Sequence, residues 1–383
     1  MNYFDYNSTC PLLPAAHEAW AAAAGKYWAN PSSASQPASA ARVFLSECRE
    51  AWAVHFACRP ENIVFTAGTT EASNAVLSWT ERNANRDARL LLSPFEHPAV
   101  LEPAQALFPN RLDFMPLDAR GVIDLQAVEE QLRAKPYALV GLMAANNESG
   151  LLQPLSELAL LCQTLGILIL CDAAQWIGKL PSSELPAVDY LTVSGHKFGG
   201  PRGTGVLVLS DAAAGFRGRI GGGQEHGHHA GTENLEGIAA ITAAIAAQPA
   251  AGWPRENLDA FLKTLSGSAF RIIGEDLPRL PNTLSLLIPR HKATRWLPRL
   301  EKHGFIVSSG AACATTKVGP SHVMKALGLT DDESSRVIRI SSGPETDEAA
   351  WLGLRGALDA VLAELDLDDD SGDLVTVIDP DAL

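Results

Sequence analysis

The sequence predicts an α/β fold in which a large domain with a mostly parallel sheet is followed by a smaller α+β domain. Short apolar runs rich in Val, Ile and Leu alternate with longer Ala-rich amphipathic segments. Such nearly continuous apolar strands are typical of a parallel sheet that is covered on both faces. Hydrophobic residues make up 46% of the 383 residues, so a sizeable core can form, and this length fits two domains.

Seven strands are expected in the large sheet, at residues 63–65, 90–92, 112–115, 138–143, 167–171, 190–193 and 205–209. Ligands of such sheets gather outside the carboxyl ends of the strands. Polar residues follow several of these expected ends: Thr69, His97, Asn147, Asp172 and Lys197. This edge of the sheet is therefore the predicted site.

The boundary between the two parts is expected after an Ala-rich helix at residues 233–248, where a Pro- and Gly-containing segment follows. Beyond it, shorter strands are expected at residues 270–273, 283–288, 305–307 and 337–340. We expect residues 15–250 to form the large domain and residues 1–14 and 251–365 the small one. The last helix is expected to end near residue 365, and residues 366–383 to form an acidic, mobile tail.

Composition excludes several classes of protein. The formal net charge of −14 argues against nucleic acid or an anionic membrane as the main partner. No apolar run approaches the roughly 20 residues that span a bilayer, and the first residues lack the basic and apolar segments of a signal peptide. The six cysteines show no C-x-x-C spacing, which predicts reduced thiols in a cytoplasmic protein.

Lys197 and Asp172 are the first residues whose positions in the sequence indicate a catalytic site. Lys197 follows an expected strand and precedes a glycine-rich turn, a placement in which lysine forms Schiff bases with carbonyl cofactors. Asp172 ends the preceding strand, where its carboxylate could balance a pyridinium nitrogen. Each residue also has a purely structural interpretation, a solvated loop for the lysine and a turn or helix cap for the aspartate. In this order they predict a pyridoxal phosphate (PLP) site.

Two further segments fit the same site. Thr69 and Thr70 follow a glycine at an expected helix start, where free N–H groups and hydroxyls can hold a phosphate, although plain N-capping is the alternative. Ser194 and His196, beside the lysine, could complete this cradle. His97 follows another strand, where an imidazole could stack on a flat ring and shuttle protons, or serve only as a loop residue.

Cys313 stands among Gly, Ala, Ser and Thr residues. Such small neighbours favour an exposed and mobile thiol that can travel to its target. The other five cysteines lie in helical or strand patterns and are expected to be core or incidental residues.

Nine motifs in order resemble those of the cysteine desulfurases, PLP enzymes of the class V aminotransferase group with the fold-type I architecture. The resemblance runs from about Asp5 to Arg339. The motifs are Gly68-Thr69-Thr70-Glu71, Glu96-His97, Asn146-Asn147-Glu148-Ser149-Gly150, Asp172-Ala173-Ala174-Gln175, Ser194-Gly195-His196-Lys197, Gly221-Gly222-Gly223-Gln224-Glu225, Ala230-Gly231-Thr232-Glu233-Asn234, Ser308-Ser309-Gly310-Ala311-Ala312-Cys313 and Arg339-Ile340-Ser341.

The resemblance implies a role for each residue near the ring. Lys197 would carry PLP and later move the proton at the substrate's Cα. Asp172 would pair with the pyridinium nitrogen, and Gln175 would hydrogen-bond the ring hydroxyl. His97 would stack on the ring and help to deprotonate the substrate thiol, and Asn147 would contact the cofactor or the substrate.

The resemblance also implies how phosphate, substrate and sulfur are held. The phosphate would be bound by Thr69, Thr70, Ser194 and His196. Thr232 would reach the phosphate from the partner subunit of a homodimer, and Arg339 would grip the substrate carboxylate as a fork that lysine cannot replace. Cys313 would take the sulfur of L-cysteine as a persulfide and leave alanine, and a protein acceptor that the sequence does not identify would receive the sulfur.

Two alternatives stay open. A related class V lyase or aminotransferase, including a selenocysteine lyase, would use another substrate and leave Cys313 incidental. A degenerate paralog would only bind or regulate, but the presence of Lys197, Asp172, His97 and Arg339 argues against it.

The chain departs from the resemblance in one loop above all. The family carries two arginines where this chain reads His226-Gly227-His228-His229, and it often has serine at Ala311 and arginine at Pro344. These three histidines could bind a metal, but a glycine-flanked polar loop is the expectation, and no metal is predicted.

Overall fold

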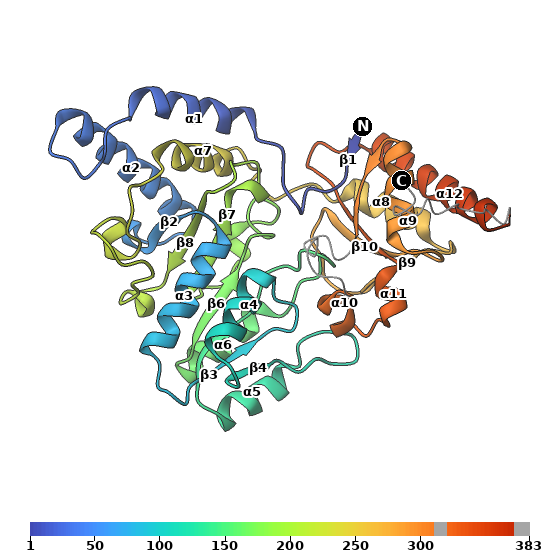
Figure 1. Cartoon of the computed structure of the whole chain (residues 1–383), viewed down its shortest axis with the longest axis horizontal. Coiled ribbons are helices and arrows are strands. Elements are labelled where there is room, and N and C mark those ends of the chain that lie inside the picture. Colours follow the sequence, from blue (N-terminus) through green and yellow to red (C-terminus); the bar gives the residue numbers. More distant parts are fainter. Residues whose placement is uncertain (310–319, 371–383) are drawn as a thin grey trace, which may run out of the picture.

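The computed structural model describes residues 1–309 and 320–370. The chain forms two parts, which lie at the left and right of Figure 1. The left part is built on a seven-stranded sheet, and the right part on a four-stranded sheet. Cys313 and residues 371–383 of the acidic segment lie outside the described residues.

The large sheet is mostly parallel, as predicted. In spatial order its strands are β2 (Ile63–Thr66), β8 (Gly205–Leu209), β7 (Tyr190–Ser194), β6 (Leu168–Asp172), β5 (Tyr137–Gly141), β3 (Arg89–Leu92) and β4 (Leu112–Phe114). Strand β8 runs antiparallel to both of its neighbours, and the other pairs are parallel. All seven expected strands are present, with ends that differ from the expected ones by at most two residues.

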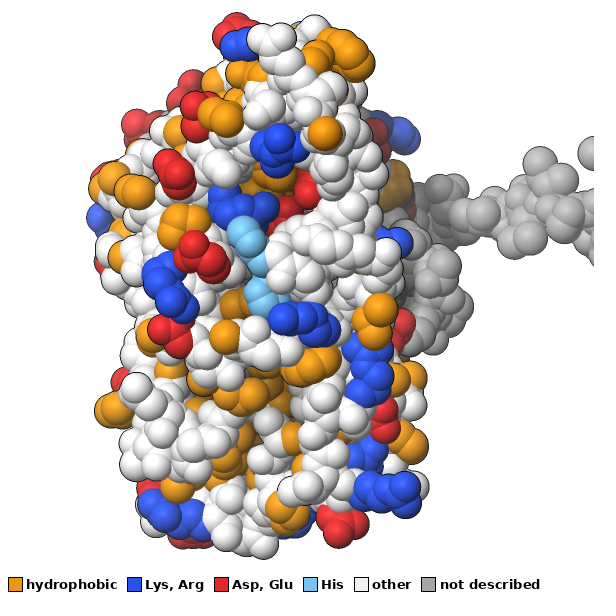
Figure 2. Space-filling view, turned by 90° about the vertical axis from the view of Figure 1, so that its left-hand side faces the viewer, with side chains coloured by type: hydrophobic (Ala, Val, Ile, Leu, Met, Phe, Trp, Pro, Cys, Tyr) orange, Lys and Arg blue, Asp and Glu red, His pale blue; other side chains and the backbone are white. Residues whose placement is uncertain are grey.

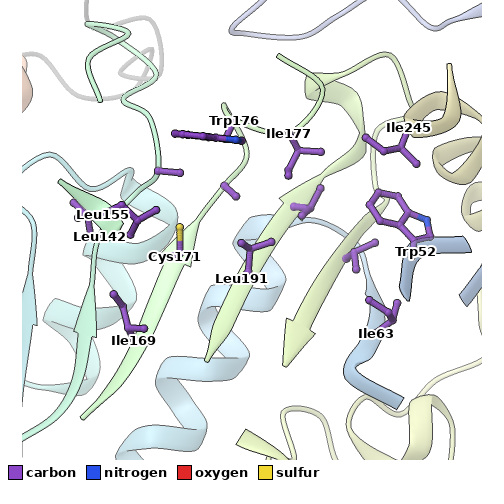
Figure 3. Packing of buried hydrophobic residues seen from close by; sticks show 14 of the residues in the cluster. Trp52, Ile63, Leu142, Leu155, Ile169, Cys171, Trp176, Ile177, Leu191 and Ile245 are labelled. Carbon is purple, nitrogen blue, oxygen red and sulfur yellow. The ribbon is translucent and has the colours of Figure 1, made fainter. Parts of the chain in front are cut away.

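Helices cover both faces of this sheet, because alternate strand residues point to opposite sides. Phe65 packs in a layer with α1 (Pro14–Lys26), α2 (Gln36–His55), α5 (Leu125–Ala134), α6 (Leu155–Leu165) and α7 (Leu235–Ala246). Its neighbour Val64 packs on the other face with α3 (Thr69–Asn83) and α4 (Pro98–Leu107). Figure 3 shows the first layer, where Trp52 of α2 and Ile245 of α7 lie close together over the strands.

The smaller sheet is antiparallel. Its order is β12 (Ser308–Ser309), β13 (Val337–Ser341), β10 (Thr283–Leu287) and β9 (Arg271–Ile272). A separate core forms between this sheet and three helices, α8 (Glu256–Leu265), α9 (Ala293–Lys302) and α12 (Glu348–Asp370). Two short helices, α10 (His322–Ala326) and α11 (Asp331–Ser335), precede β13.

The N-terminal segment connects the two parts. Strand β1 (Asn2–Tyr3) pairs with β11 (Phe305–Ile306) in the right-hand part, and the chain then crosses to α1 on the left (Figure 1). At the crossing, Asn7 Nδ2 donates to Asn147 O at 3.1 Å and to Thr283 Oγ1 at 3.0 Å. Asn7 therefore touches both parts at the place where they meet.

The last helix runs past its expected end near residue 365, because its acidic end is paired. Asp368 lies 2.5 Å from Arg299, and Asp369 lies 3.1 Å from Arg295, both on α9. These ion pairs offset the mutual repulsion of the aspartates, which the sequence pattern alone suggested would end the helix. Within the described ranges, no helix has the length and apolar character needed to cross a bilayer.

Candidate active site

A cavity of about 280 Å³ lies at the carboxyl ends of the central strands. It is lined by most of the residues that the sequence predicted: Thr69, Thr70, His97, Asn147, Asp172, Gln175, Ser194, His196 and Lys197. The structure thus brings together side chains at the ends of five different strands of the sheet, β2, β3, β5, β6 and β7. Asn7 and Ser8 of the crossing segment close the same cavity.

Lys197 reaches the cavity from the end of β7. The strand stops at Ser194, and a single 3₁₀ turn (Gly195–Lys197) places the lysine at the sheet edge. Its Nζ donates to the main-chain oxygens of Asn7 at 2.7 Å and Ser8 at 3.0 Å. The crossing segment therefore fixes the amine inside the site.

Asp172 is the buried last residue of β6. Its Oδ1 accepts from Ala174 N at 2.9 Å, and it forms no ion pair with any residue in the described ranges. Burial raises its pKa to about 6, and the Ala174 N–H and the charge of Lys197 oppose that rise. A carboxylate in this setting favours a cationic partner.

The start of α3 has the features of an anion site. Gly68 precedes the helix at φ 134°, and no side chain caps it, so the capping role considered for Thr69 and Thr70 is not seen. Thr69 N donates to Ser194 Oγ at 2.9 Å, while Thr69 Oγ1 is buried and has no partner among the described residues. An orphaned hydroxyl beside free helix N–H groups suits a phosphate.

His97 combines the two roles that its position suggested. It is the N-cap of α4, where its Nδ1 accepts from Ala99 N at 3.1 Å, and it also lines the cavity. Burial lowers its pKa to about 4, and the nearby charge of Lys197 lowers it further. The ring is therefore neutral near pH 7 and, with Nδ1 accepting, carries its hydrogen on Nε2.

Arg339 lies just behind the cavity wall on β13 and is 1% exposed. One amino group contacts Asp5 Oδ1 at 2.6 Å and Ser8 Oγ at 2.7 Å, and the other donates to Asn147 O at 3.0 Å. Ser8 and Asn147 line the cavity while Arg339 itself does not. The predicted fork is thus held in place by the two residues that separate it from the cavity.

Comparison with known proteins decides the family. The model of the class V aminotransferases matches residues 2–350. A cysteine desulfurase of Rhodobacter capsulatus is 33% identical over 377 residues, which cover 95% of this chain and 97% of that protein. The cysteine desulfurase IscS of Dictyoglomus turgidum is 31% identical over 353 residues, 89% of each chain. The chain belongs to the cysteine desulfurases of the class V aminotransferase family.

Comparison with solved structures agrees. A NifS-like protein superposes with a TM-score of 0.84 at 28% identity, covering 96% of this chain and 99% of the other. A structure described as SspA in complex with cysteine gives a TM-score of 0.79 at 28% identity, covering 90% and 99% of the two chains. These likenesses confirm the predicted fold-type I architecture.

Thr232, like Arg339, is a predicted site residue that does not line the main cavity. It is exposed, and with Glu71, Arg219 and His229 it lines a second cavity of about 180 Å³. Figure 2 shows histidine side chains in a hollow between basic and acidic ones, on the face seen from the left of Figure 1. A single chain therefore leaves Thr232 away from the residues that line the main cavity.

The histidine loop is braced by separate contacts. His229 Nε2 lies 3.2 Å from Glu71 Oε1, and this close contact is the main reason why the pKa of Glu71 falls to about 2. His228 is buried and its Nδ1 lies 2.7 Å from Phe216 O, while His226 is exposed. Within the described part of the chain, no group of three or more His, Cys, Asp or Glu side chains could hold a metal ion.

Several residues around the cavity carried no role in the sequence analysis. Asn7, Ser8 and Met143 line it, and Lys179 is buried behind Gln175. The polar run Asn7-Ser8-Thr9 after an apolar start was the available signal for the first two. Lys179 stands four residues after Gln175, a spacing that brings two side chains together on a helical turn.

Proposed function

We propose that the protein is a PLP-dependent L-cysteine desulfurase that takes the substrate's sulfur onto Cys313 as a persulfide, releases alanine and delivers the sulfur to a protein acceptor. The observation that carries this proposal is the convergence of Lys197, Asp172 and Thr69 on one cavity at the sheet edge. The names of the relatives support L-cysteine as the substrate.

The residues present fit PLP. The orphaned Thr69 hydroxyl and the start of α3 suit its phosphate, with Thr70, Ser194 and His196 beside them. Buried Asp172 suits the charge of its ring nitrogen, and Lys197 supplies the amine for its carbonyl carbon. When bound, PLP supplies an electron sink for negative charge at the substrate's Cα.

The protein's part is orientation and proton transfer. Lys197, fixed by the Asn7 and Ser8 oxygens, is placed to take and return the proton at Cα. Gln175 offers an N–H to the ring hydroxyl. Asn147 would contact the substrate, and Arg339 would bind its carboxylate by giving up its contacts with Ser8 and Asn147. The contact with Asp5 would hold the guanidinium in position.

We assign to His97 the removal of the proton from the substrate's thiol. Because its Nδ1 accepts the Ala99 N–H, the neutral ring presents a hydrogen and not a lone pair at Nε2. To take a proton at Nε2, the ring must adopt the other tautomer and give up its bond to Ala99. The cap of α4 and the acid–base step are therefore coupled.

The sulfur step needs no outside oxidant. The Cys313 thiolate attacks the substrate's sulfur, so an S–S bond forms as the substrate's C–S bond breaks. The carbon keeps the bonding electrons and gains a proton, which gives alanine, while the sulfur is oxidised to the persulfide level. Holding the thiolate near its target makes this step effectively intramolecular, an advantage of up to about 7–11 kcal/mol.

We further propose that the enzyme is a cytoplasmic homodimer in which Thr232 completes the phosphate site of the partner subunit. The exposure of Thr232 outside the cavity supports this arrangement. The free thiols of Cys48, Cys162 and Cys171, buried in the core, support a reducing compartment.

The test uses purified protein reconstituted with PLP and given L-cysteine. We expect equimolar alanine and persulfide, and borohydride treatment should fix a pyridoxyl group on Lys197 by mass spectrometry. Cys313→Ala should keep the pyridoxyl group and lose the persulfide, whereas Cys58→Ala should keep both. Turnover of another amino acid that survives Cys313→Ala would identify a related class V lyase or aminotransferase. Failure to bind PLP would identify a non-catalytic paralog.

A further inference from the structure

Lys179 is a fully buried lysine directly behind the cavity. Its Nζ donates to Asn7 Oδ1 at 2.7 Å and to Gln175 Oε1, and it lies 5.7 Å from the centre of the Trp253 ring. In the described ranges no carboxylate lies within ion-pair distance of it. Burying an ammonium group with neutral partners is costly, and such groups are concentrated at functional sites.

The amide of Gln175 has only one satisfactory orientation beside this lysine. Its Oε1 accepts from Lys179, and its Nε2 donates to Asn7 O at 2.9 Å. Burial lowers the pKa of Lys179 to about 7, but the orientation of the amide holds for either charge state of the lysine. The flipped amide would point its oxygen at the Asn7 carbonyl oxygen, which is repulsive, and its NH₂ at the hydrogens of Nζ. Nε2 carries two hydrogens, and the second has no acceptor among the described residues, although Gln175 lines the cavity.

The same ammonium group orients Asn7. Asn7 Oδ1 accepts from Lys179, so Asn7 Nδ2 is the atom that donates to Asn147 O and Thr283 Oγ1. Asn7 O in turn accepts from Lys197 Nζ at 2.7 Å. Lys179 therefore fixes two amides that both touch the wall of the site.

We propose that Lys179 is a positioning residue that fixes the Gln175 amide so that an N–H, and not a carbonyl oxygen, faces the ring hydroxyl of the cofactor. This inference rests on the proposed function, because that hydroxyl belongs to PLP. It concerns the environment of the ring oxygen and does not depend on which amino acid is the substrate.

The inference has a spectroscopic consequence. An N–H donated to the ring oxygen and a nearby positive charge both favour the less protonated form of the bound chromophore. Without Lys179 the amide can present its oxygen, and the charge is lost as well. The charged and titratable groups that interact with Lys179 are Lys197, Arg339, Cys10 and His196, and they remain in every variant below.

The experiment is a pH titration of the visible absorption of the PLP-loaded enzyme. In Lys179→Met, we expect the midpoint to rise by about one pH unit relative to the wild type. In Gln175→Leu, we also expect a rise, and in the double variant no further rise beyond that of Gln175→Leu. Asn282→Ala is the matched control, because Asn282 contacts Asn7 Oδ1 at 3.5 Å without touching Gln175, and its midpoint should not move.

Two outcomes would overturn the inference. One is an unshifted midpoint in Lys179→Met that binds PLP fully, and the other is an equal shift in the presence and absence of Gln175. Lys179→Gln, which removes the charge but keeps polar atoms, provides the same comparison if methionine prevents folding. A wild type that binds no PLP would refute the proposed function itself, so the two failures are distinguishable.

Discussion

The side chains around the cavity are buried to an unusual degree for ionisable groups. Burial raises the pKa of Asp172 to about 6 and that of Glu148 to about 7, and it raises the pKa of Glu96 to about 8 with a further contribution from Asp172. Burial thus makes the ionised form of each carboxyl group less favourable than it is in water. A protein without cofactor therefore bears a free-energy cost near neutral pH that a bound pyridinium would relieve.

Asp172→Asn should stabilise the cofactor-free protein and abolish tight PLP binding. The folded pKa lies above the ordinary value of 3.8, so the stability from the protonated carboxyl is present below about pH 4 and is lost as the pH rises through about 6. We expect the variant to be about 1–3 kcal/mol more stable than the wild type at pH 7, with no difference near pH 4. Urea unfolding of both apoproteins at the two pH values measures this.

Exposed Asp87 provides the matched control, because Asp87→Asn should change nothing at either pH. An apoprotein of Asp172→Asn that is less stable than the wild type at pH 7 would contradict the assignment of a costly buried charge.

Short elements with double roles hold the site together. The start of α3 offers an unfilled anion site, and the start of α4 is capped by the imidazole that also lines the cavity. Strand β2 is braced by Glu225, whose Oε2 accepts from Phe65 N at 2.8 Å and whose Oε1 pairs with Arg49 at 2.7 Å. The starts of α3 and α4 therefore contribute groups both to the fold and to the predicted site.

His97→Ala and His97→Asn separate the cap from the chemistry. Both variants lose the imidazole, so we expect desulfuration to fall by about 10²-fold or more in each. Only alanine removes the acceptor for the Ala99 N–H, so only His97→Ala should lose about 1 kcal/mol of stability. Urea unfolding and alanine release measure the two effects. Equal destabilisation by both substitutions would show that the cap bond does not matter.

Glu225→Gln should destabilise the fold strongly, because it leaves buried Arg49 without its counter-charge. Removing one partner of a buried ion pair typically costs about 3–5 kcal/mol. The exposed pair of Arg255 and Asp259 offers the comparison, since Asp259→Asn should cost less than about 1 kcal/mol. Urea unfolding of the three proteins checks this. Comparable losses at the two pairs would argue against the bracing role.

Sequence patterns predicted the elements that carry their own signal. The seven strands of the large sheet are continuous apolar runs, so they could be found without the fold. Strands β1 and β12, which were not predicted, have two residues each, and their pairing depends on segments that are distant in sequence. Lys179 was missed for a related reason: lysine is normally exposed, and only the packed structure shows that this one is buried.

The two parts of the molecule, each built on its own sheet, meet at the site. We propose that they correspond to two domains, residues 15–250 and residues 1–14 with 251–365, because each sheet packs its own hydrophobic cluster. The positions of Lys197 and Asp172 at the ends of β7 and β6 were predictable from the order of residues along the chain. The placement of Arg339 behind Ser8 was not, because it depends on how the second core and the crossing segment come together.

Hybrid dimers test the partner role of Thr232. Lys197→Ala should be inactive, and Thr232→Ala should bind PLP about tenfold more weakly because one hydrogen bond is lost. If Thr232 acts across the interface, a mixed dimer of the two variants contains one intact site, so mixing should restore tight PLP binding and activity at limiting PLP. Each variant mixed with itself is the control. No recovery in the mixture would place Thr232 in the site of its own chain.

The first residues of the chain pair with residues between positions 305 and 341. Asn2 pairs with Phe305 and Asp5 with Ser341, and the same segment supplies the oxygens that hold the Lys197 amine. During translation the large sheet can assemble well before residues 305–341 have left the ribosome, but strand β1 has no partner until β11 emerges. We therefore expect PLP to bind only after the complete polypeptide has been released. A nascent chain stalled after the large sheet should show no visible absorption from bound PLP.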